Sequence, residues 1–503
     1  MVNFSLLLEG FLACLLPVNL FALFVGTAFG IVIGALPGLT STVAVAVLLP
    51  VTFSMDPGTG LILLGSTYGG AMYGGSISAI LLNTPGTPAA AATCIEGYPM
   101  AKKGRAGEAL GMAAVASFIG GTLSIIALIF VAPPLAKVAL TFGPLEYFFL
   151  ALCGMSIVIS ISTNSLTKGF ISAIIGLLLG TVGMDPIVGF ERYTFDSINL
   201  MMGLPLVPTL VGMLSTSQLL LLAEEKSQTI LKVNTVSGKI CPSWADLKRL
   251  KAVLIRSSLI GIVVGALPGA GANISTFLAY DDAKRISKHP EQFGTGIVDG
   301  IAATESSNNA ITGGAMATML TLGIPGSNTT AIMLGGLMIH GLQPGPGFFT
   351  DASGSAYTFM AGLLIANFIM LAIGLLAVRA FMHVVKIPNN VLIAVVMVMS
   401  VVGSYAINNS MFDVGLMLVF GVIGYLLRKG GFNVVPIVLG LVLGPIAEKG
   451  FRRAIVLSKG NFFGFFMSRP ISVVLAIVTL IFIGWPIYKW IKSQKNRSTA
   501  QAQ

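Results

Sequence analysis

Long apolar segments, several of them interrupted by glycine and proline, are the feature that most constrains the fold of this chain. A helix needs about 20 mostly apolar residues to cross about 30 Å of hydrocarbon. Uninterrupted runs of or just below this length lie near 109–133, 145–162, 168–183, 203–222, 357–380, 388–405, 411–427, 432–446 and 470–488. Interrupted apolar stretches lie near 15–50, 61–100, 257–280 and 297–340. This pattern predicts an all-α polytopic membrane protein.

The composition supports a membrane-embedded chain and gives the interruptions a meaning. Only 10% of the 503 residues are charged and 55% are hydrophobic, whereas soluble domains carry about 25% charged residues. A helix broken at membrane depth frees backbone N–H and C=O groups, which only surrounding protein or a watered cavity satisfies. The breaks are therefore either kinks of packing helices or parts of a solute site, and we interpret them as a solute site.

Two short motifs recur in the same order, which indicates an internal repeat. The sequence GALPG at 34–38 returns at 265–269, which is 231 residues later. NTPGT at 83–87 has a looser counterpart, GIPGS, at 323–327, which is 240 residues later. A glycine pair and an apolar stretch precede both members of the second motif. Two ordered motifs at nearly constant spacing favour two homologous halves.

The charges of equivalent loops indicate that these halves have opposite orientations. Loop 50–60 has no Lys or Arg, whereas its equivalent, 281–293, has three; loop 96–108 has three, whereas 340–356 has none. Because Lys and Arg mark cytoplasmic loops, equivalent loops lie on opposite sides of the membrane. The halves are therefore predicted to be inverted-topology repeats, as in many secondary transporters. The net charge of +10 is explained by these topogenic loops, and no nucleic acid partner is expected.

The spacing of basic residues predicts re-entrant hairpins. Arg256 and Lys284 both carry the cytoplasmic signature, yet too few residues separate them for two spans of about 20 residues each. The segment 257–280 should therefore enter the membrane and return, with Pro268 and Gly269 near its tip.

The remaining broken segments follow from the repeat. By symmetry, 15–50 forms a hairpin that enters from the outside. The segments 61–100 and 297–340 then become single crossings, broken near Pro85 and Pro325.

The chain is thereby divided into a first repeat (1–222), a cytoplasmic linker (223–256), a second repeat (257–488) and a cytoplasmic tail (489–503). One segment conflicts with the charge rule, because the same parity places 448–469 outside although it contains five Lys and Arg residues.

The breaks gather small hydroxyl and amide side chains, which suit a solute site without a Lys or Arg. Helix N-termini carry a partial positive charge and free N–H groups, which favour anions, while unwound carbonyls favour Na⁺. The competing interpretation is that these side chains only cap the half-helices. The candidate substrate-binding residues are Pro37, Gly38, Thr40, Ser41, Asn83, Thr84, Pro85, Gly86, Thr87, Gly269, Gly271, Asn273, Pro325, Gly326, Ser327, Asn328 and Thr329.

An acidic residue within an apolar segment marks the candidate cation site. Glu305 precedes the second break by about 20 residues, and an ionisable residue in such a segment is a functional hypothesis by default. The alternative is a position at the cytoplasmic interface. The cation-coupling candidates are Ser275, Thr276, Glu305, Asn308 and Asn309, with a Na⁺ site at the helix breaks.

Several stretches resemble the large membrane subunit of the tripartite tricarboxylate transporter family, and the resemblance covers nearly the whole chain. They are GALPGLTSTVAVAVLLP, YGGSISAILLNTPGTPAAAAT, EGYPMAKKGRAGEALG, ESSNNAITGGAMATMLTLGIPGSNTTAIMLGGLMIHGLQPGP and SRPIS. The halves are not chemically equal, since the first break has Thr87-Pro88 where the second has Ser327-Asn328.

The resemblance implies a cation-coupled carrier, usually sodium-driven, for carboxylates such as citrate, in the bacterial inner membrane. It implies two partners, a small membrane subunit of about four helices and a soluble periplasmic solute-binding protein. It also implies an elevator-type mechanism, in which a hairpin-bearing domain slides against a scaffold. The GALPG and PG-Ser/Thr breaks would then be substrate and cation loops, and sodium the one ion required, without another cofactor.

Other functions find less support in the sequence. No GxxxxGK[ST] motif indicates an ATP-driven pump. The motifs GxSxG and HExxH are absent, and His289, His340 and His383 are dispersed, which disfavours an enzyme. A channel accommodates paired broken helices too, but would show no coupling to an ion. A sodium–dicarboxylate carrier that works without partners is the nearest alternative.

Overall fold

The computed structural model describes residues 2–161, 166–185, 188–224, 240–267, 271–350, 352–384 and 388–484. It is about 81% helical, which confirms the all-α prediction. The described residues also include one short antiparallel strand pair, β1 (Gly183–Met184) and β2 (Glu191–Arg192). Among the described helices, those long and apolar enough to cross a membrane are Pro17–Gly34, Ala106–Ala139, Leu206–Glu224, Ser353–Leu376 and Met411–Lys429.

The chain forms two compact units, and each draws residues from both predicted repeats. Unit 1 contains 1–139 and 210–425, and unit 2 contains 140–209 and 426–503. The units therefore do not follow the predicted boundary between the halves. The first stretch of unit 1 holds α1 (Phe4–Cys14), α2 (Pro17–Gly34), α3 (Ser41–Leu48), η1 (Leu49–Ser54), α4 (Pro57–Leu82), η2 (Pro88–Ala90), α5 (Ala91–Lys102) and α6 (Ala106–Ala139).

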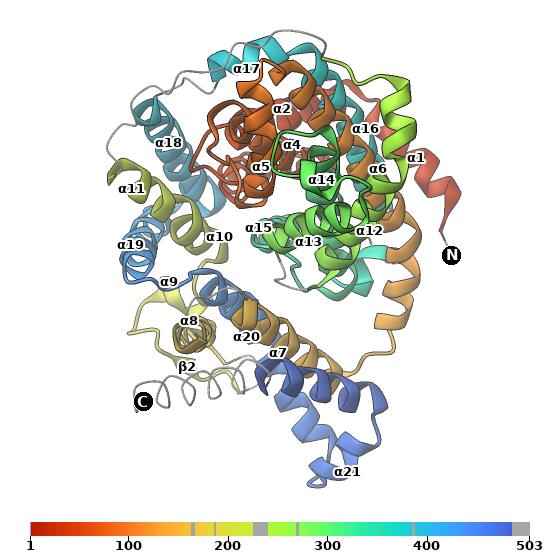
Figure 1. Cartoon of the computed structure of the whole chain (residues 1–503). Helices are drawn as coiled ribbons and strands as arrows, with labels where there is room; N and C mark the ends of the chain where they lie inside the picture. Colours follow the sequence, from red (N-terminus) through yellow and green to blue (C-terminus); the bar gives the residue numbers. More distant parts are fainter. Residues whose placement is uncertain are drawn as a thin grey trace, which may run out of the picture. The chain divides into compact units, whose positions relative to one another are not determined.

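The second stretch of unit 1 begins within a continuous helical segment and ends in α19. It holds a π-helical turn (Val211–Thr216), α11 (Ser217–Glu224), α12 (Trp244–Ala266), α13 (Gly271–Ile286), η4 (Pro290–Gln292), α14 (Val298–Leu322), α15 (Asn328–Ile339), η5 (Pro346–Phe349), α16 (Ser353–Leu376), α17 (Val378–Val384), α18 (Asn389–Asn408) and α19 (Met411–Lys429). In Figure 1, α4 and α14 lie among α2, α5, α6, α12 and α16, and buried side chains of these helices form a common core.

Local sequence signals set the ends of the two central helices of unit 1. The Asp56 side chain accepts the Gly58 N–H, and Pro57 occupies the first helical position of α4. The helix α4 ends at Asn83 and α14 ends at Gly323, which adopt left-handed conformations with φ of 56° and 71°. Both are residues that tolerate this conformation, which terminates a helix.

The segments predicted to form hairpins contain helix pairs, α2 with α3 and α12 with α13, and the first helix of the second pair is longer than expected. α12 begins at Trp244 rather than near 257, and Ser243 forms a capping box with Asp246. The segment assigned to the linker is therefore helical from Trp244 onward. The charges of this extension are paired with the same unit, since Arg249 contacts Asp299 at 2.9 Å. Because the first turns of α12 are charged and capped, they lie outside the apolar run, and the helix predicted from that run was too short.

The two broken crossings are also built differently from the simple interruption that was predicted. α4 has 26 residues, which corresponds to about 39 Å of helix and is by itself long enough for a membrane. After Asn83 the chain folds back, so that the Gly86 N–H donates to Gly75 O at 3.2 Å. α5 then packs along the end of α4, with Gly97 against Ile80. The residues of the break, which follow Asn83, therefore run back along the side of α4 and do not continue its axis.

Close approaches between helix backbones hold α2 against α4 and α12 against α14. A Cβ atom at Gly34 would lie 2.2 Å from Ala71 O, and one at Gly265 would lie 2.6 Å from Ile311 O. Both distances are too short for any side chain, so these two positions require glycine. Such contacts suit an apolar environment, where van der Waals packing of small residues holds helices together.

The facing helices carry matching glycines. A Cβ at Gly74 on α4 would lie 2.4 Å from Ile31 O, and one at Gly314 on α14 would lie 2.3 Å from Ile262 O. Each glycine and each carbonyl has its counterpart at the spacing of the sequence motifs, 240 and 231 residues. The pairs α2–α4 and α12–α14 are therefore packed by equivalent contacts.

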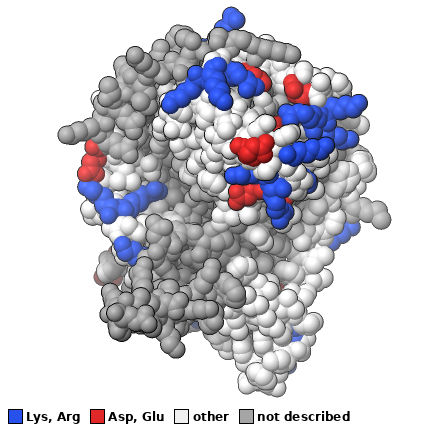
Figure 2. All heavy atoms as spheres, viewed as in Figure 1, with Lys and Arg blue, Asp and Glu red and all other residues white. Residues whose placement is uncertain are grey.

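Charged side chains of unit 1 gather on one face, over the ends of α5, α12 and α13 (Figure 2). The two charged loops meet there, since the Lys103 ammonium donates to Thr295 O at 2.7 Å. Arg256 approaches Asp282 on the same face at 3.4 Å. Loop 96–108 and loop 281–293 therefore share a side of the unit, which is the arrangement that a common cytoplasmic assignment requires.

Unit 2 contains residues 448–469, the segment that conflicts with the charge rule. Its elements are α7 (Pro144–Ile161), α8 (Leu166–Leu179), the β1–β2 pair, α9 (Ile198–Met201), most of α10 (Leu206–Leu210), α20 (Val435–Leu457), α21 (Phe462–Met467) and a helix at Pro470–Gly484. Arg452 on α20 forms ion pairs with Asp185 and Glu448. Arg469 contacts Glu146 at 3.3 Å. Two of the five basic residues are thus paired within the unit, and the side of the membrane on which this segment lies stays a prediction.

A first prediction concerns the backbone approaches. Replacing Gly30 or Gly261 by alanine places a Cβ 2.3 Å from Thr67 O or 2.5 Å from Ser307 O. We expect each change to cost about 1–3 kcal/mol because the helices must move apart, which lowers the thermal unfolding midpoint of the purified protein. The control is Gly415→Ala on α19, where a Cβ meets nothing within 4 Å. It should leave the midpoint unchanged or raise it, and equal midpoints for all three variants would contradict the packing.

Candidate functional site

The broken helices meet in two pairs, and each pair joins a hairpin of one half to the break of the other. The first pair, named here the α3–α15 junction, consists of residues 40–42 and 327–330. The Thr329 hydroxyl lies 3.0 Å from the Ser41 hydroxyl and 3.2 Å from the Thr42 hydroxyl. Both segments are first turns of helices, and the Thr40 and Ser327 side chains cap them by accepting the N–H groups of Val43 and Thr330.

The second pair, the α13–α5 junction, consists of residues 275–276 and 87–93. The Thr276 hydroxyl donates to Ala89 O at 3.0 Å. The Ser275 hydroxyl is hydrogen-bonded to Ser307 on α14. The Thr87 hydroxyl is buried and has no hydrogen-bond partner among the described residues. In this junction too, a predicted hairpin of one half contacts the break of the other half.

The backbone at both breaks is held against the glycines of the hairpins. A Cβ at Gly86 would lie 1.9 Å from Gly34 O, and one at Gly326 would lie 2.6 Å from Gly265 O. The residue that follows each of these break glycines begins a helical turn. The Ser327 side chain forms a capping box with Thr330, and the Tyr68 hydroxyl lies 3.2 Å from the Ser327 hydroxyl. Steric fit and capping together fix the two tips.

The structure divides the predicted substrate residues into accessible and buried groups. Exposed or half-buried are Pro37, Gly38, Thr40, Asn83, Thr84, Pro85, Ser327 and Asn328. Buried are Ser41, Gly86, Thr87, Pro325, Gly326 and Thr329. Thr40 and Ser327 cap α3 and α15, as the competing interpretation expected for such residues. Gly271 begins α13, whereas Gly269 and the side chain of Asn273 lie outside the described residues. That the two predicted hairpins and the two breaks line one solute site stays a prediction.

Glu305 is fully buried and lies beside the α13–α5 junction, where it is joined to Thr93 on α5. Its carboxyl accepts hydrogen bonds from the Thr93 hydroxyl on α5, from the Ser117 hydroxyl on α6 at 3.1 Å and from the Asn308 amide at 3.4 Å. All these partners are neutral. A buried carboxylate without a cationic partner is costly unless it takes up a proton or a cation.

Glu96 is a second fully buried acid, which the sequence analysis missed. One carboxyl oxygen accepts the Tyr280 hydroxyl at 2.8 Å and the Gly294 N–H, and the other accepts the N–H groups of Gly296 and Ile297. Each oxygen therefore has two donors. Glu96 ties α5 to α13 and to the loop before α14, which is a structural role.

The two junctions differ in what they favour chemically. Two helix N-termini and neutral hydroxyl groups make the α3–α15 junction suited to an anion such as a carboxylate. At the α13–α5 junction the contact comes from Thr276, in the second turn of α13, and the nearby Glu305 carboxyl, which accepts from Thr93 on α5, adds an acceptor that suits a cation. The described residues of both junctions include no Lys or Arg.

Comparisons with known proteins agree with this arrangement. The sequence model of the Tripartite tricarboxylate transporter TctA family matches residues 20–439. An uncharacterized 52.8 kDa protein of Agrobacterium vitis, from the TAR-I ttuC' 3' region, is 38% identical over 488 residues, 97% of each chain. An uncharacterized protein from the TAR-II ttuC' 3' region of the same organism is 32% identical over 237 residues, which are 47% of this chain and 98% of that protein. No solved structure matches.

The two buried acids should respond differently to glutamine. In Glu96→Gln the new NH₂ group faces two donors, so at least one buried hydrogen bond is lost at about 1–3 kcal/mol. In Glu305→Gln the Thr93 hydroxyl rotates to accept, because Thr304 lies 3.0 Å away as its alternative acceptor. We expect Glu96→Gln to lower the thermal unfolding midpoint clearly and Glu305→Gln to leave it nearly unchanged. An equal loss in both variants would contradict this separation of roles.

Proposed function

Because the chain belongs to the tripartite tricarboxylate transporter TctA family, we propose that it is the large membrane subunit of a sodium-coupled secondary transporter that imports tricarboxylates or related carboxylates. Its proposed partners are a small membrane subunit of about four helices and a periplasmic solute-binding protein. Its proposed location is the bacterial inner membrane, as a multi-pass protein.

The observation that carries this proposal is the convergence of helix N-termini from opposite halves. At the α3–α15 junction, Ser41 and Thr329 contact each other directly and Asn328 is exposed, while Asn83 is exposed at the start of the other break. N–H groups and neutral side chains hold a carboxylate through charge-assisted hydrogen bonds and release it more readily than a fixed cation does. A site that must load and unload in each cycle benefits from this.

The same contacts support an inverted repeat and an elevator-type movement. Gly34 and Gly265 make equivalent contacts, and the hairpins exchange partners between the halves. Such an exchange ties α2–α5 and α12–α15 into one body within unit 1. Close contacts between helix backbones hold this body together, so that both junctions would move with it as one rigid element. An elevator-type mechanism requires such a rigid body that slides against a scaffold.

Cation coupling is the finer part of the proposal. Glu305 lies next to the α13–α5 junction, and Ser275 and Thr276 place hydroxyl groups on the facing helix. A cation there offsets the buried carboxyl and the charge of a carboxylate substrate. Binding of one ion therefore favours binding of the other, which is the linkage that symport needs.

Uptake of a labelled tricarboxylate into vesicles tests the whole proposal. The vesicles contain the chain and its small subunit, and the matched binding protein is added outside, with an inward sodium gradient or a choline gradient of equal strength. We expect uptake only with both sodium and the binding protein. Uptake without the binding protein favours the standalone carrier, and passive equilibration without any ion dependence favours a channel; either outcome contradicts the proposal.

A matched pair of substitutions tests the substrate site. Asn83 and Asn409 are both exposed asparagines that end a helix in the left-handed conformation, with φ of 56° and 51°. Glycine keeps this conformation, so Asn→Gly removes only the amide. We expect Asn83→Gly to raise the KM for uptake by about tenfold, the equivalent of one lost hydrogen bond of about 1.4 kcal/mol. Asn409→Gly, remote from both junctions in the sequence, should leave KM unchanged; equal KM values for both variants would place the substrate elsewhere.

A further inference from the structure

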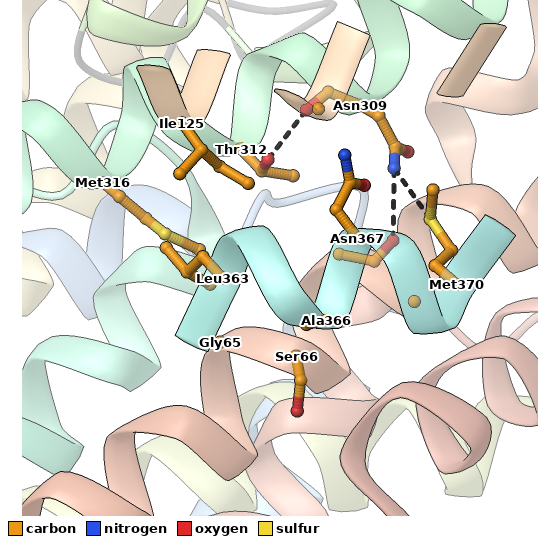
Figure 3. A pocket seen from close by; sticks show the side chains of 13 residues that line it. Gly65, Ser66, Ile125, Asn309, Thr312, Met316, Leu363, Ala366, Asn367 and Met370 are labelled. Atoms are coloured by element: carbon orange, nitrogen blue, oxygen red, sulfur yellow. Dashed lines mark hydrogen bonds between the residues drawn. The ribbon is translucent and has the colours of Figure 1, made fainter. Parts of the chain in front are cut away.

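Two features of unit 1 lie outside both junctions. One is a small, partly open pocket of about 20 Å³ between α4, α6, α14 and α16. In Figure 3 the Asn309 amide nitrogen is directed to the Met370 sulfur, at 3.2 Å, and most of the remaining lining is apolar. Such a lining offers little to a charged ligand. The other feature is the outer face of α12, where exposed lysines lie next to a run of exposed apolar side chains.

This face of α12 carries an exposed stripe that changes from polar to apolar along the helix. Its members recur every three or four residues, apart from the last interval of the same length, which keeps them on one side of a helix. In chain order, the α12 stripe consists of Trp244, Lys248, Lys251, Ile255, Leu259 and Val263. Trp244 is 81% exposed, Leu259 55% and Val263 62%. The opposite side of α12 packs into unit 1 through the buried Leu250 and Leu254.

The basic residues of α12 fall into two groups. Arg249 donates to both oxygens of the Asp299 carboxylate, at 3.0 and 2.9 Å, and Arg256 lies 3.4 Å from an aspartate of α13. Acids of the same unit therefore compensate the charges of these arginines. Lys248 and Lys251 have neither an ion pair nor a side-chain hydrogen bond among the residues that the structure describes. Their charges are available to a partner outside the chain.

We propose that the α12 stripe binds an anionic phospholipid of the cytoplasmic leaflet. Lys248 and Lys251 are neighbours on the helix surface, about 5–6 Å apart at their Cβ atoms, so both ammonium groups reach one lipid phosphate. Their apolar stems lie along the helix while the charged ends stay at the level of the head groups. The exposed residues from Ile255 to Val263 follow along the stripe and contact the acyl chains. This inference does not depend on the proposed transport activity.

The order of side chains along the stripe favours a lipid over other occupants. A free phosphate uses the two lysines but leaves the apolar residues uncovered. An apolar helix of a partner protein covers the apolar residues but buries two lysine charges without acceptors, which is costly. An anionic phospholipid satisfies both ends of the stripe, and the cytoplasmic leaflet attracts basic residues that flank a membrane span. The stripe begins on the charged face of unit 1 (Figure 2), which is predicted to be cytoplasmic.

The test is phospholipid binding to the purified full chain in a neutral detergent, with the dissociation constant of the first bound lipid measured by native mass spectrometry. We expect Lys248→Gln/Lys251→Gln to weaken binding of phosphatidylglycerol about 30-fold, the loss expected for two lysines near an anionic surface. Binding of phosphatidylcholine should not change. Lys248→Arg/Lys251→Arg keeps both charges and should keep the affinity. The matched control is Lys137→Gln, an exposed lysine near the other end of α6, which should also keep it.

Equal affinities of the unmodified chain and the double glutamine variant for phosphatidylglycerol, at equal thermal unfolding midpoints, would overturn the inference. A second measurement needs no variant. The preference of the unmodified chain for phosphatidylglycerol over phosphatidylcholine should fall when salt is raised from about 0.05 to about 0.5 M, because exposed charges are screened, and a constant preference would contradict the site. Displacement of the lipid by inorganic phosphate, or by the small membrane subunit, would identify a different occupant and also overturn it.

Discussion

The backbone polar groups that are freed where helices break inside an apolar body are the constraint on which this structure depends. The freed groups find partners both nearby and far away in the sequence. The Gly86 N–H donates to Gly75 O and Ser327 closes a capping box with Thr330, each within its own half, whereas Ala89 O accepts from the Thr276 hydroxyl of the other half. The Thr276 contact and the contact of Ser41 with Thr329 join the two halves within unit 1. Satisfying the broken helices thus contributes to holding the halves together.

The sequence motifs predicted where the chain turns but not what the turns contact. GALPG and the two PG motifs located the hairpin of α2–α3, the tip of α12–α13 and both breaks. The exchange of partners, in which Ser41 meets Thr329, was not predicted. Helices that are apolar on all sides give no periodic signal for the face that packs, so the pairing of distant segments has no trace in one sequence. The long first arm of α12 was missed for a different reason, because its first turns are charged and lie outside the apolar run.

The surroundings of Glu96 show why this buried acid was not predicted from the sequence. It stands close to the basic loop at Lys102 and Lys103, where an acid usually faces water. Its partners are mostly backbone N–H groups of residues 294–297, and a backbone donor leaves no mark in the sequence. Glu305 was found because it interrupts a stretch of small and polar residues without a neighbouring cation. An acid is thus recognisable from sequence where its surroundings are anomalous, and unrecognisable where the main chain satisfies it.

Positions at which the two halves depart from each other carry the chemistry. At the 240-residue spacing, Gly65 corresponds to Glu305, Gly69 to Asn309 and Asn83 to Gly323. In the first half Gly65 packs against Phe359 and Leu363, an apolar environment that would reject a carboxylate. The glycines that hold the helices together, such as Gly34 and its counterpart Gly265, occur in both halves. Glu305 and Asn309 occur only in the second half. A carrier with a strictly symmetric interior would treat its two junctions alike. Under the proposed function, an acid beside only one of the two junctions gives the cation and the carboxylate separate places, so that binding of each favours binding of the other.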